Sequence, residues 1–441
     1  MSFTKSLTNT FLTKGLISFL GLFTGIIKAR WLGVEGVGML AVLQLVLSMS
    51  FRILNFGLGS SLAYFGAKGE IGMKLSLKLI IKAAIVLSLL AIVLLLFVKN
   101  VPPSPWVEVS WLHYYLILTC VPLFFLQNYM QRSLTAKLLI KEINFSDTLA
   151  TITNLAALLV FVILFNLKII GAIYAVMSSL VISDIYLYGL FRKQNKLEKA
   201  IQQVSTPFNK MIAYGFWNYL LMVVNYIIEQ LPLFLLKNLS EGFFAVGLYS
   251  KAKSLEQKAR LVTNPVSQLI FPYTAASTSE NSIKRTNQLT RVTLVLITLV
   301  IGGFSIVIKD VIGIMYGSDF IPAAKVFYAT TIGIVLWPIG QFHAVHIAAS
   351  GDAKKIFLHN LYILLPSVPI MYFLVKYYGI IGAGWCFSLI QILNFIIRLR
   401  IYLTSTKSSF AEIFIPRKTD VELVLKILSG FYIKFRNIIK K

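Results

Sequence analysis

The chain has 441 residues, of which 57% are hydrophobic and 13% are charged, and its formal net charge is +25. Soluble domains carry about 25% charged residues, so this composition excludes an ordinary soluble protein and indicates a membrane protein. Apolar runs of about 20 residues recur along the whole length, and each is long enough to cross the hydrocarbon core as a helix.

The sequence therefore predicts an all-α integral membrane protein with about twelve transmembrane helices. The first apolar run follows only Lys5 and has no small-residue cleavage site, so we interpret it as a retained helix and not as a signal peptide. The spans are expected near residues 11–32, 37–65, 75–98, 111–133, 145–166, 169–191, 212–236, 243–273, 290–314, 322–349, 356–376 and 380–400.

An internal repeat divides these spans into two sets of six. The tract 168–172 (KIIGA) recurs as 379–383 (GIIGA), with its isoleucine pair 211 residues further on. Upstream, 32–38 (LGVEGVG) is echoed by 239–247 (LSEGFFAVG), whose closing glycine lies 209 residues later, with a three-residue slip inside the echo. Duplicated membrane halves around a central site are typical of transporters. We predict a six-helix lobe over 1–194, a linker over 195–211, a second pseudo-symmetric lobe over 212–403 and a basic cytoplasmic tail over 404–441.

The distribution of cationic residues predicts the orientation. With both termini placed in the cytoplasm, 29 of the 42 Lys and Arg residues fall in cytoplasmic segments or span ends, 8 fall on the outer side and 5 lie deeper in spans. Cationic residues accumulate on the cytoplasmic side of membrane proteins, so the basic excess is first a topology signal, and nucleic-acid binding is a poor second explanation. The partners expected from this pattern are membrane lipids and a transported substrate.

The eighth span is the most unusual segment, because residues 246–260 (VGLYSKAKSLEQKAR) place five charges within ten residues at membrane depth. A charged side chain at the centre of the bilayer costs at least roughly 2.5–3.5 kcal/mol, so this helix is expected to line a wet cavity if it spans at all. Glu256 has Lys253 at i−3 and Arg260 at i+4, and these three residues can form a charge ladder on one face. Lys251 and Lys258 share another face, without an in-helix carboxylate partner.

An unpaired lysine pair in a membrane requires an anion, which is either a carboxylate of another helix, such as Glu229 or Asp184, or a transported substrate. Lys253, Arg260, Arg52 and Arg30 extend the candidate binding set, and structural pairing with Glu256 is the favoured alternative for Lys253 and Arg260. Arg52 lies in the second span, one residue from the position onto which the 209-residue offset maps Arg260, so the two arginines are expected at similar depths. A guanidinium group binds phosphate oxygens in pairs, which fits a substrate that carries a pyrophosphate. Anchoring by snorkelling is the alternative for Arg52, and it is the stronger alternative for Arg30 near the end of the first span.

Other polar residues in the spans suggest ion coupling and not catalysis. Glu229 precedes Pro232 in the seventh span and is our candidate for carrying a coupling H⁺ or Na⁺, with pairing to a lysine as the alternative. His343 and His346 have metal-compatible spacing, but no third ligand lies nearby in the sequence, so we predict no metal site. No nucleotide-binding loop, G-x-S-x-G or H-E-x-x-H motif is present in the sequence, and we predict no enzyme and no bound cofactor.

Five short motifs resemble the polysaccharide-transporter branch of the multidrug/oligosaccharidyl-lipid/polysaccharide flippase superfamily, that is, Wzx-like O-antigen or capsule-unit flippases. The motifs are 29–38 (ARWLGVEGVG), 56–61 (FGLGSS), 245–252 (AVGLYSKA), 316–320 (YGSDF) and 348–352 (AASGD). The resemblance implies two six-helix lobes around a cationic cavity lined by spans one, two, seven and eight. It also implies that an undecaprenyl-pyrophosphate-linked oligosaccharide is flipped across the bacterial inner membrane by alternating access.

The sequence departs from two related groups in ways that narrow this expectation. Lipid II flippases typically carry arginines midway along span one and two extra helices, whereas Ser18 and Thr24 are neutral here and twelve spans leave no room. A cation-coupled multidrug antiporter of the same fold remains the first alternative, although the charge balance within the spans is basic. A membrane glycan polymerase is the second alternative. If the protein is a flippase, its expected protein partners are a polysaccharide polymerase and glycosyltransferases.

Overall fold

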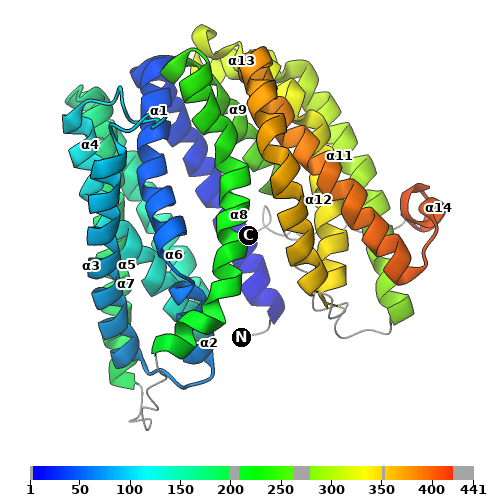
Figure 1. The fold of residues 1–441 in the computed structure, drawn as a ribbon, viewed down its shortest axis with the longest axis horizontal. Coiled ribbons are helices and arrows are strands. Elements are labelled where there is room, and N and C mark those ends of the chain that lie inside the picture. Colours follow the sequence, from blue (N-terminus) through cyan, green and yellow to red (C-terminus); the bar gives the residue numbers. More distant parts are fainter. Residues whose placement is uncertain (1–2, 198–207, 262–278, 350–352, 421–441) are drawn as a thin grey trace, which may run out of the picture. The chain divides into compact units, whose positions relative to one another are not determined.

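The computed structural model describes residues 3–197, 208–261, 279–349 and 353–420, and no strand occurs in this part of the chain. Figure 1 shows long helices that run roughly side by side within each part of the chain. The elements are α1 (Phe3–Leu54), α2 (Leu58–Ala67), α3 (Met73–Val98), α4 (Trp111–Leu118), α5 (Cys120–Ala136), α6 (Ile140–Leu158), the π-helical turn η1 (Leu159–Leu164), α7 (Lys168–Leu197), α8 (Phe208–Leu239), α9 (Gly242–Leu261), α11 (Ser279–Tyr316), the 3₁₀ turn η2 (Ser318–Phe320), α12 (Ala323–Ala349), α13 (Ala353–Thr406) and α14 (Phe410–Phe414).

Eight helical stretches of the described chain are long and apolar enough to cross a membrane, so the protein is a multi-pass membrane protein. Two of the eight, Thr13–Leu54 and Asn360–Thr406, are of double length and each covers two predicted spans. Between them the eight stretches cover ten of the twelve predicted spans. The fourth and the eighth predicted spans are the exceptions.

The two exceptions have different causes. The fourth predicted span is divided at Thr119 into α4 and α5, which have 8 and 17 residues. The eighth predicted span corresponds to α9, which begins at Gly242 and carries the cluster of charges. The predicted continuation of that span, 262–273, lies outside the described residues.

The second predicted span, 37–65, was wrong as a single helix. The helix ends at Leu54, the chain turns at Phe56 and Gly57 with φ values of 44° and 76°, and a separate short helix, α2, follows. A left-handed conformation cannot continue a right-handed helix, and glycine adopts it without a steric cost. The sequence 56–61 (FGLGSS) supplies that break, so the hydrophobic run is longer than its helix.

The internal repeat is visible in the backbone. Gly33 and Gly242, which are 209 residues apart, both have positive φ, of 68° and 57°. Lys168 and Gly379, which are 211 residues apart, also both have positive φ, of 46° and 53°. The same turn geometry therefore recurs at corresponding places in the two copies. Gly33 and Gly242 have the same 209-residue offset as Gly38 and Gly247, so the two backbones align without the three-residue gap that the sequence alignment of these motifs needs.

Segments 34–38 and 243–247 also meet each other. A Cβ atom on Gly38 would come within 1.8 Å of the Phe243 carbonyl oxygen, and a Cβ on Gly247 would come within 2.1 Å of the Val34 carbonyl oxygen. Phe243 is the repeat counterpart of Val34, and Gly247 is that of Gly38, so the contact is reciprocal. Only glycine lets two backbones approach this closely, which is why a glycine closes each copy of the motif.

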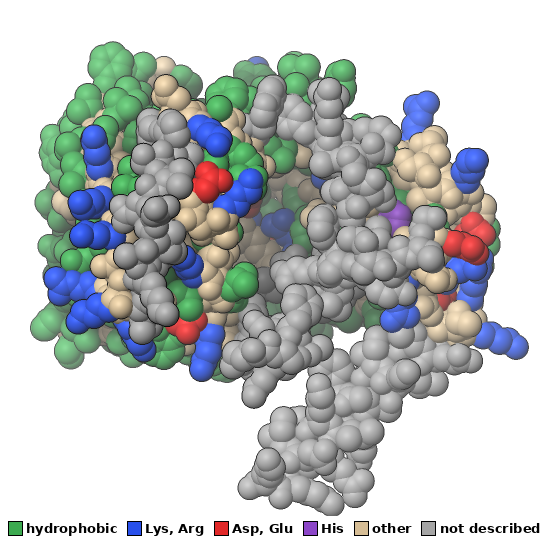
Figure 2. Space-filling view, turned by 90° about the horizontal axis from the view of Figure 1, so that it is seen from below, with side chains coloured by type: hydrophobic (Ala, Val, Ile, Leu, Met, Phe, Trp, Pro, Cys, Tyr) green, Lys and Arg blue, Asp and Glu red, His purple; other side chains and the backbone are tan. Residues whose placement is uncertain are grey.

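The chain forms two compact units that do not follow the repeat boundary. The first comprises 1–251, 312–323 and 375–380, and the second comprises 252–311, 324–374 and 381–441. The predicted lobe boundaries and linker stay predictions, and residues 198–207 of the linker and 421–441 of the tail lie outside the described residues. In the first unit, exposed Lys and Arg side chains gather where α3 begins and α7 ends, and Figure 2 shows them on the face seen from below.

Candidate functional site

Lys251 is the most enclosed of the predicted binding cations. Its side chain is buried, with 6% of the residue exposed, although it is a lysine within an apolar helix bundle. The Nζ atom donates a hydrogen bond of 2.7 Å to the Gly25 carbonyl oxygen in α1. It also lies 5.0 Å from the centroid of the Tyr316 ring. A carbonyl dipole and a ring face both stabilise a cation, which makes a buried ammonium tolerable here.

The glycine crossing positions this lysine. Gly247 allows α9 to approach α1 at backbone distance, and Lys251 follows one helical turn later on the same side of α9. Gly25 adds to this closeness, because a Cβ there would lie 3.9 Å from the Lys251 Nζ atom. The glycine that closes the second copy of the repeat motif therefore also positions the Lys251 ammonium group.

Arg30 has a different environment, since its guanidinium group contacts the last turn of α11. The Nε atom donates to the Met315 carbonyl oxygen at 3.3 Å, and an η nitrogen donates to the Ile314 carbonyl oxygen at 2.5 Å. The final carbonyl groups of a helix lack intrahelical partners and carry partial negative charge. This contact favours an anchoring role, while substrate binding by Arg30 stays a prediction.

Arg52 is exposed in the last turn of α1 and lies over an aromatic ring. Its Cζ atom is 6.0 Å from the centroid of the Tyr226 ring in α8. The Tyr226 hydroxyl group is in turn 2.9 Å from the Ser48 hydroxyl group. The ring holds the guanidinium group by its face and leaves the N–H donors of Arg52 available, and among the described residues Arg52 has no ion pair.

Arg260 is the corresponding arginine of the second repeat, and it is neutralised. Its Nε atom lies 2.5 Å from the Glu256 Oε1 atom, with side-chain exposures of 20% and 3%. Its Cζ atom is also 5.4 Å from the Trp337 ring and 5.3 Å from the Phe387 ring. The predicted charge ladder is thus confirmed for Glu256 and Arg260, and these contacts favour a structural role for Arg260.

The remaining predicted residues differ in exposure. Lys258 is half-buried, and its Nζ atom donates to the Ser254 hydroxyl oxygen at 3.3 Å, one turn earlier on α9. Lys253 is half-buried, and its place in the charge ladder stays a prediction. Glu229 is exposed on α8. Its role as an ion carrier stays a prediction as well.

The two histidines form part of a polar core in the second unit. The buried His343 ring stacks on the Tyr402 ring, with centroids 4.3 Å apart, and His346 Nδ1 lies 3.1 Å from the Thr286 hydroxyl oxygen. Tyr402 donates to the Asn287 side-chain oxygen at 2.8 Å. No group of three or more potential metal ligands occurs among the residues that the structure describes.

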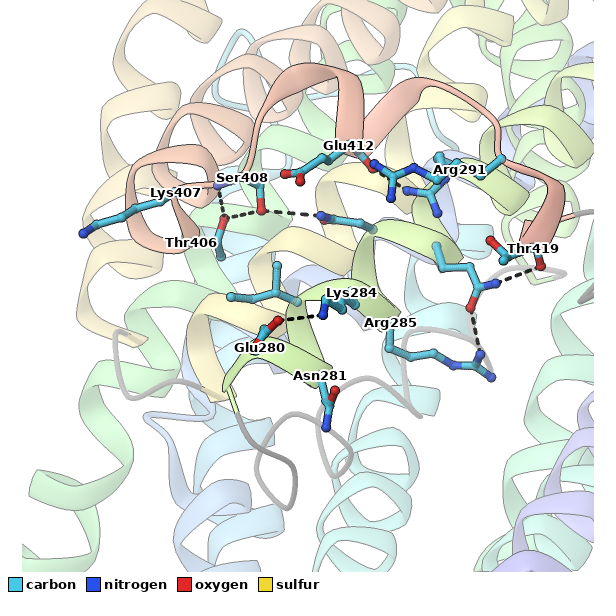
Figure 3. Close-up of a pocket in the computed structure, with 14 residues that line it drawn as sticks. Glu280, Asn281, Lys284, Arg285, Arg291, Thr406, Lys407, Ser408, Glu412 and Thr419 are labelled. Carbon is cyan, nitrogen blue, oxygen red and sulfur yellow. Dashed lines mark hydrogen bonds and ion pairs between the residues drawn. The ribbon is translucent and has the colours of Figure 1, made fainter.

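This polar core leads to a pocket of about 660 Å³ at the start of α11 and the end of α13 (Figure 3). Arg291 makes a two-point ion pair with Asp420, at 2.6 and 2.9 Å, and also donates to the Glu412 carbonyl oxygen. Figure 3 shows Lys407 and Arg285 directed away from each other at opposite ends of the pocket. The cations therefore do not converge on a single point, and the segment that contains α14 forms part of the wall of the pocket.

Sequence reasoning missed the aromatic partners of the cations. Tyr316, Tyr226, Trp337 and Phe387 each lie under a predicted cation, but each is distant in sequence from its partner. A single sequence has no periodic signal for such contacts, because aromatic residues are frequent throughout the chain. The i, i+4 spacing of Glu256 and Arg260 is local, and it could be found.

The arrangement of helices is the fold of transporters of the MOP superfamily. A solved structure described as an inward-facing multidrug resistance MATE family transporter of the MOP superfamily matches with a TM-score of 0.73 and 16% identity, over 90% of this chain and 96% of that chain. The Lipid II flippase MurJ in an inward closed conformation matches with a TM-score of 0.71 and 16% identity, over 97% and 92%. At this identity the likeness shows the fold alone.

The sequence comparison is more specific. The family model described as "Polysaccharide biosynthesis protein" matches residues 3–278, and the chain belongs to this family. A Shigella flexneri protein named "Putative O-antigen transporter" is 23% identical over 284 residues, which are 63% of this chain and 66% of that relative. The chain thus matches slightly under two thirds of the length of this curated relative.

Proposed function

We propose that the protein is a flippase that moves an undecaprenyl-pyrophosphate-linked oligosaccharide, such as an O-antigen or capsule unit, from the inner to the outer leaflet of a bacterial inner membrane. The observation that carries the proposal is a buried ammonium group, Lys251, in a member of the polysaccharide biosynthesis family. The name of the Shigella relative supports a lipid-linked glycan as the substrate.

The chemistry of the substrate explains why cations are needed. A glycan headgroup and a pyrophosphate cannot enter hydrocarbon without losing hydration, and that loss forms the barrier to flipping. In the proposed mechanism the Lys251 ammonium and the exposed Arg52 guanidinium bind the phosphate oxygens, and the polyprenyl chain stays in lipid. The Lys251 Nζ atom donates to the Gly25 carbonyl oxygen, and a phosphate oxygen can take the place of that acceptor when the substrate binds.

The orientation belongs to the same proposal. We place both termini and the basic ends of α3 and α7 in the cytoplasm, because the membrane-proximal Lys and Arg residues concentrate there. Transport proceeds by alternating access, without covalent chemistry, and the protein is not an enzyme in this account.

The test is complementation of a strain that lacks the gene. Lys251→Ala combined with Lys258→Ala is expected to abolish glycan export while the protein remains in the membrane at its normal level. The lipid-linked unit should then accumulate in the inner leaflet, which can be measured with a leaflet-resolved lectin or enzymatic labelling assay. Normal export by the double variant would remove these lysines from the mechanism.

A matched control separates the loss of a binding cation from the loss of a buried lysine. Lys99 is 1% exposed and lies over the Trp111 and Tyr114 rings, at 4.3 and 5.4 Å. It belongs to the first unit, as Lys251 does, but it has no place in the proposed path. Lys99→Ala is therefore expected to leave export intact, even if it lowers the melting temperature.

A second candidate function is export of cationic drugs, and the MATE fold match favours it. This candidate predicts that deletion sensitises cells to cationic dyes and leaves surface glycan unchanged. The flippase proposal predicts the opposite pair of results, so one deletion strain separates the two functions.

A further inference from the structure

Asp184 in α7 is a buried carboxylate without a partner. The residue is 5% exposed, and neither carboxylate oxygen has a hydrogen-bond donor among the described residues. It lies well inside the helix, eight residues before Arg192 and sixteen residues after Lys168. Most buried polar groups in native proteins have a hydrogen-bond partner, so a buried carboxylate with none is exceptional.

The surroundings of Asp184 on its own helix are apolar. Leu180, Leu187 and Phe191, at i−4, i+3 and i+7, are all buried, so the carboxylate interrupts an apolar stripe of α7. The neighbouring Ser183 is instead satisfied by other helices. It accepts from the Gln127 amide of α5 at 2.6 Å and lies 2.7 Å from the Ser146 hydroxyl oxygen of α6.

Ionic groups on the helices that pack against α7 are engaged elsewhere or exposed. On α6, Asp147 pairs with Lys14 of α1 at 2.8 Å and also accepts from Gln131 of α5 at 2.8 Å. His113 of α4 lies 2.5 Å from the Ser110 hydroxyl oxygen. The other ionic side chains of these helices are exposed or half-buried among the described residues, namely Lys28, Arg30, Glu35 and Arg52 of α1, Lys74, Lys78 and Lys82 of α3, Arg132 of α5, and Lys141 and Glu142 of α6.

An ionised carboxylate in this position would be very unfavourable. Transfer of an unpaired charge from water into a low-dielectric interior costs so much that the group neutralises instead. Replacing Asp184 by an apolar residue would avoid the cost, yet the chain carries the carboxylate in the middle of a buried stripe. The geometry therefore points to a group that is neutral when enclosed and ionised when hydrated.

We propose that Asp184 is the proton-binding site of the transporter. In the enclosed state, H⁺ adds to one carboxylate oxygen, and the net charge at the site changes from −1 to 0. When motion of α7 relative to α5 and α6 hydrates the site, the same proton leaves for water. This assignment differs from Glu229, which is exposed on α8 and not enclosed by neighbouring helices.

The coupling of this proton to glycan flipping rests on the proposed function, but the protonation does not. Infrared spectroscopy of the purified protein in nanodiscs tests the protonation directly, because a buried protonated carboxylic acid gives a separate C=O stretching band. That band is expected in the wild type at neutral pH and is expected to be lost in Asp184→Asn. Asp147→Asn removes the ion-paired carboxylate of the same unit, and the band should remain.

A transport measurement then tests whether protons cross the membrane by way of Asp184. Proteoliposomes with an entrapped pH-sensitive dye report proton entry after an imposed pH gradient, without any need to know the glycan. The wild type and Asp147→Asn should conduct protons, Asp184→Asn should lose this flux, and Asp184→Glu should regain part of it. The assignment would be overturned if the C=O stretching band survived in Asp184→Asn. It would also be overturned if the proton flux of the wild type were unchanged in Asp184→Asn or appeared only when a Na⁺ gradient was imposed. If the band and the flux behave as expected and glycan export is normal in a deletion strain, only the proposed substrate fails.

Discussion

The two copies of the repeat are alike where they contact each other and differ where they carry charge. At the crossing, Gly38 and Gly247 play the same part, each against the backbone of the other copy. At the arginines, Arg260 has Glu256 four residues earlier, whereas the residue four before Arg52 is Ser48. The glycine contact is thus present in both copies of the repeat, whereas a carboxylate one turn before the arginine is present only in the second copy.

The difference indicates which parts of the duplication are structural. A backbone crossing needs a glycine on both sides, so both copies keep it. A phosphate site needs an uncompensated cation, and one copy is enough to provide it. In this account Arg260 with its carboxylate stabilises the second unit, and Arg52 is the arginine that remains available for an anion.

The largest expected effect tests the shared feature. Gly38→Ala and Gly247→Ala each place a Cβ within about 2 Å of a carbonyl oxygen of the other copy, and the backbones must separate. We expect each variant to lose about 3 kcal/mol of stability, measured by thermal unfolding in detergent. The two losses should be similar, because the contact is reciprocal.

Gly189→Ala on α7 is the matched control. No atom lies within 4 Å of the Cβ that this change would add, and alanine favours a helix over glycine. This variant should be as stable as the wild type or slightly more stable. Equal melting temperatures for Gly38→Ala and Gly189→Ala would show that the crossing is looser than the structure has it.

The next effect tests the neutralised arginine. Glu256→Gln removes the carboxylate, which is 3% exposed, and leaves the Arg260 charge between two rings. Removing one partner of a buried ion pair is costly, and with Arg260 at 20% exposure we expect a loss of about 2 kcal/mol in the unfolding free energy. Glu280→Gln breaks another i, i+4 pair, Glu280 with Lys284, whose side chains are 78% and 71% exposed, and it should not change the melting temperature measurably.

Much of this comparison could be predicted from the sequence. The apolar runs predicted the helices, the two echoes predicted the duplication, and the spacing of Glu256 and Arg260 predicted their pairing, because each of these signals is local or repeats at a fixed period. The break at Phe56 and Gly57 was missed, since the hydrophobic run continues across it and only the backbone torsion angles mark the turn.

Long-range contacts could not be predicted. Nothing in a single sequence indicates that the Gly25 carbonyl oxygen and the Tyr316 ring meet the Lys251 ammonium, because these groups come from helices far apart along the chain. The isolation of Asp184 was equally hidden. The sequence suggested it as a partner for a lysine, whereas the structure leaves both of its oxygens unpaired among the described residues.

A smaller effect is expected at Arg52, where function and not stability should change. Arg52→Ala removes a charge-assisted contact with a phosphate, so export should fall by about tenfold, or about 1.4 kcal/mol, while the amount of protein stays normal. Arg52→Lys keeps the charge and should retain part of the export. The control is Arg192→Ala, which removes another exposed arginine that lies over a tyrosine, 5.3 Å from the Tyr188 ring, and export should be unaffected. Full export by a stable Arg52→Ala variant would show that Arg52, like Arg260, does not bind the substrate.

The smallest effect concerns the segment around α14, which follows the second copy of the repeat. A capping box between Ser409 and Glu412 starts this short helix, and the ion pair of Asp420 with Arg291 fastens the chain that follows it. Asp420→Asn should release this segment without unfolding the helices. Trypsin should then cut at Arg417 or Lys418 faster than in the wild type.

The pH dependence of this attachment follows from the bonds of Asp420. Burial raises the pKa of this carboxyl group, but the hydrogen bonds and charges of Arg291 and Arg417 outweigh burial, and the pKa lies below its ordinary value. A carboxylate with a lowered pKa stabilises the folded state above the unfolded pKa of about 4 and loses that contribution as the pH falls below it. A spin label at Lys418→Cys can report this, because the native Cys120 and Cys386 are both buried. The label should be immobile at neutral and mildly acidic pH and should become mobile only below the usual carboxyl range. In Asp420→Asn it should be mobile at every pH, and a label that loosens near neutral pH would mean that a histidine and not Asp420 controls the attachment.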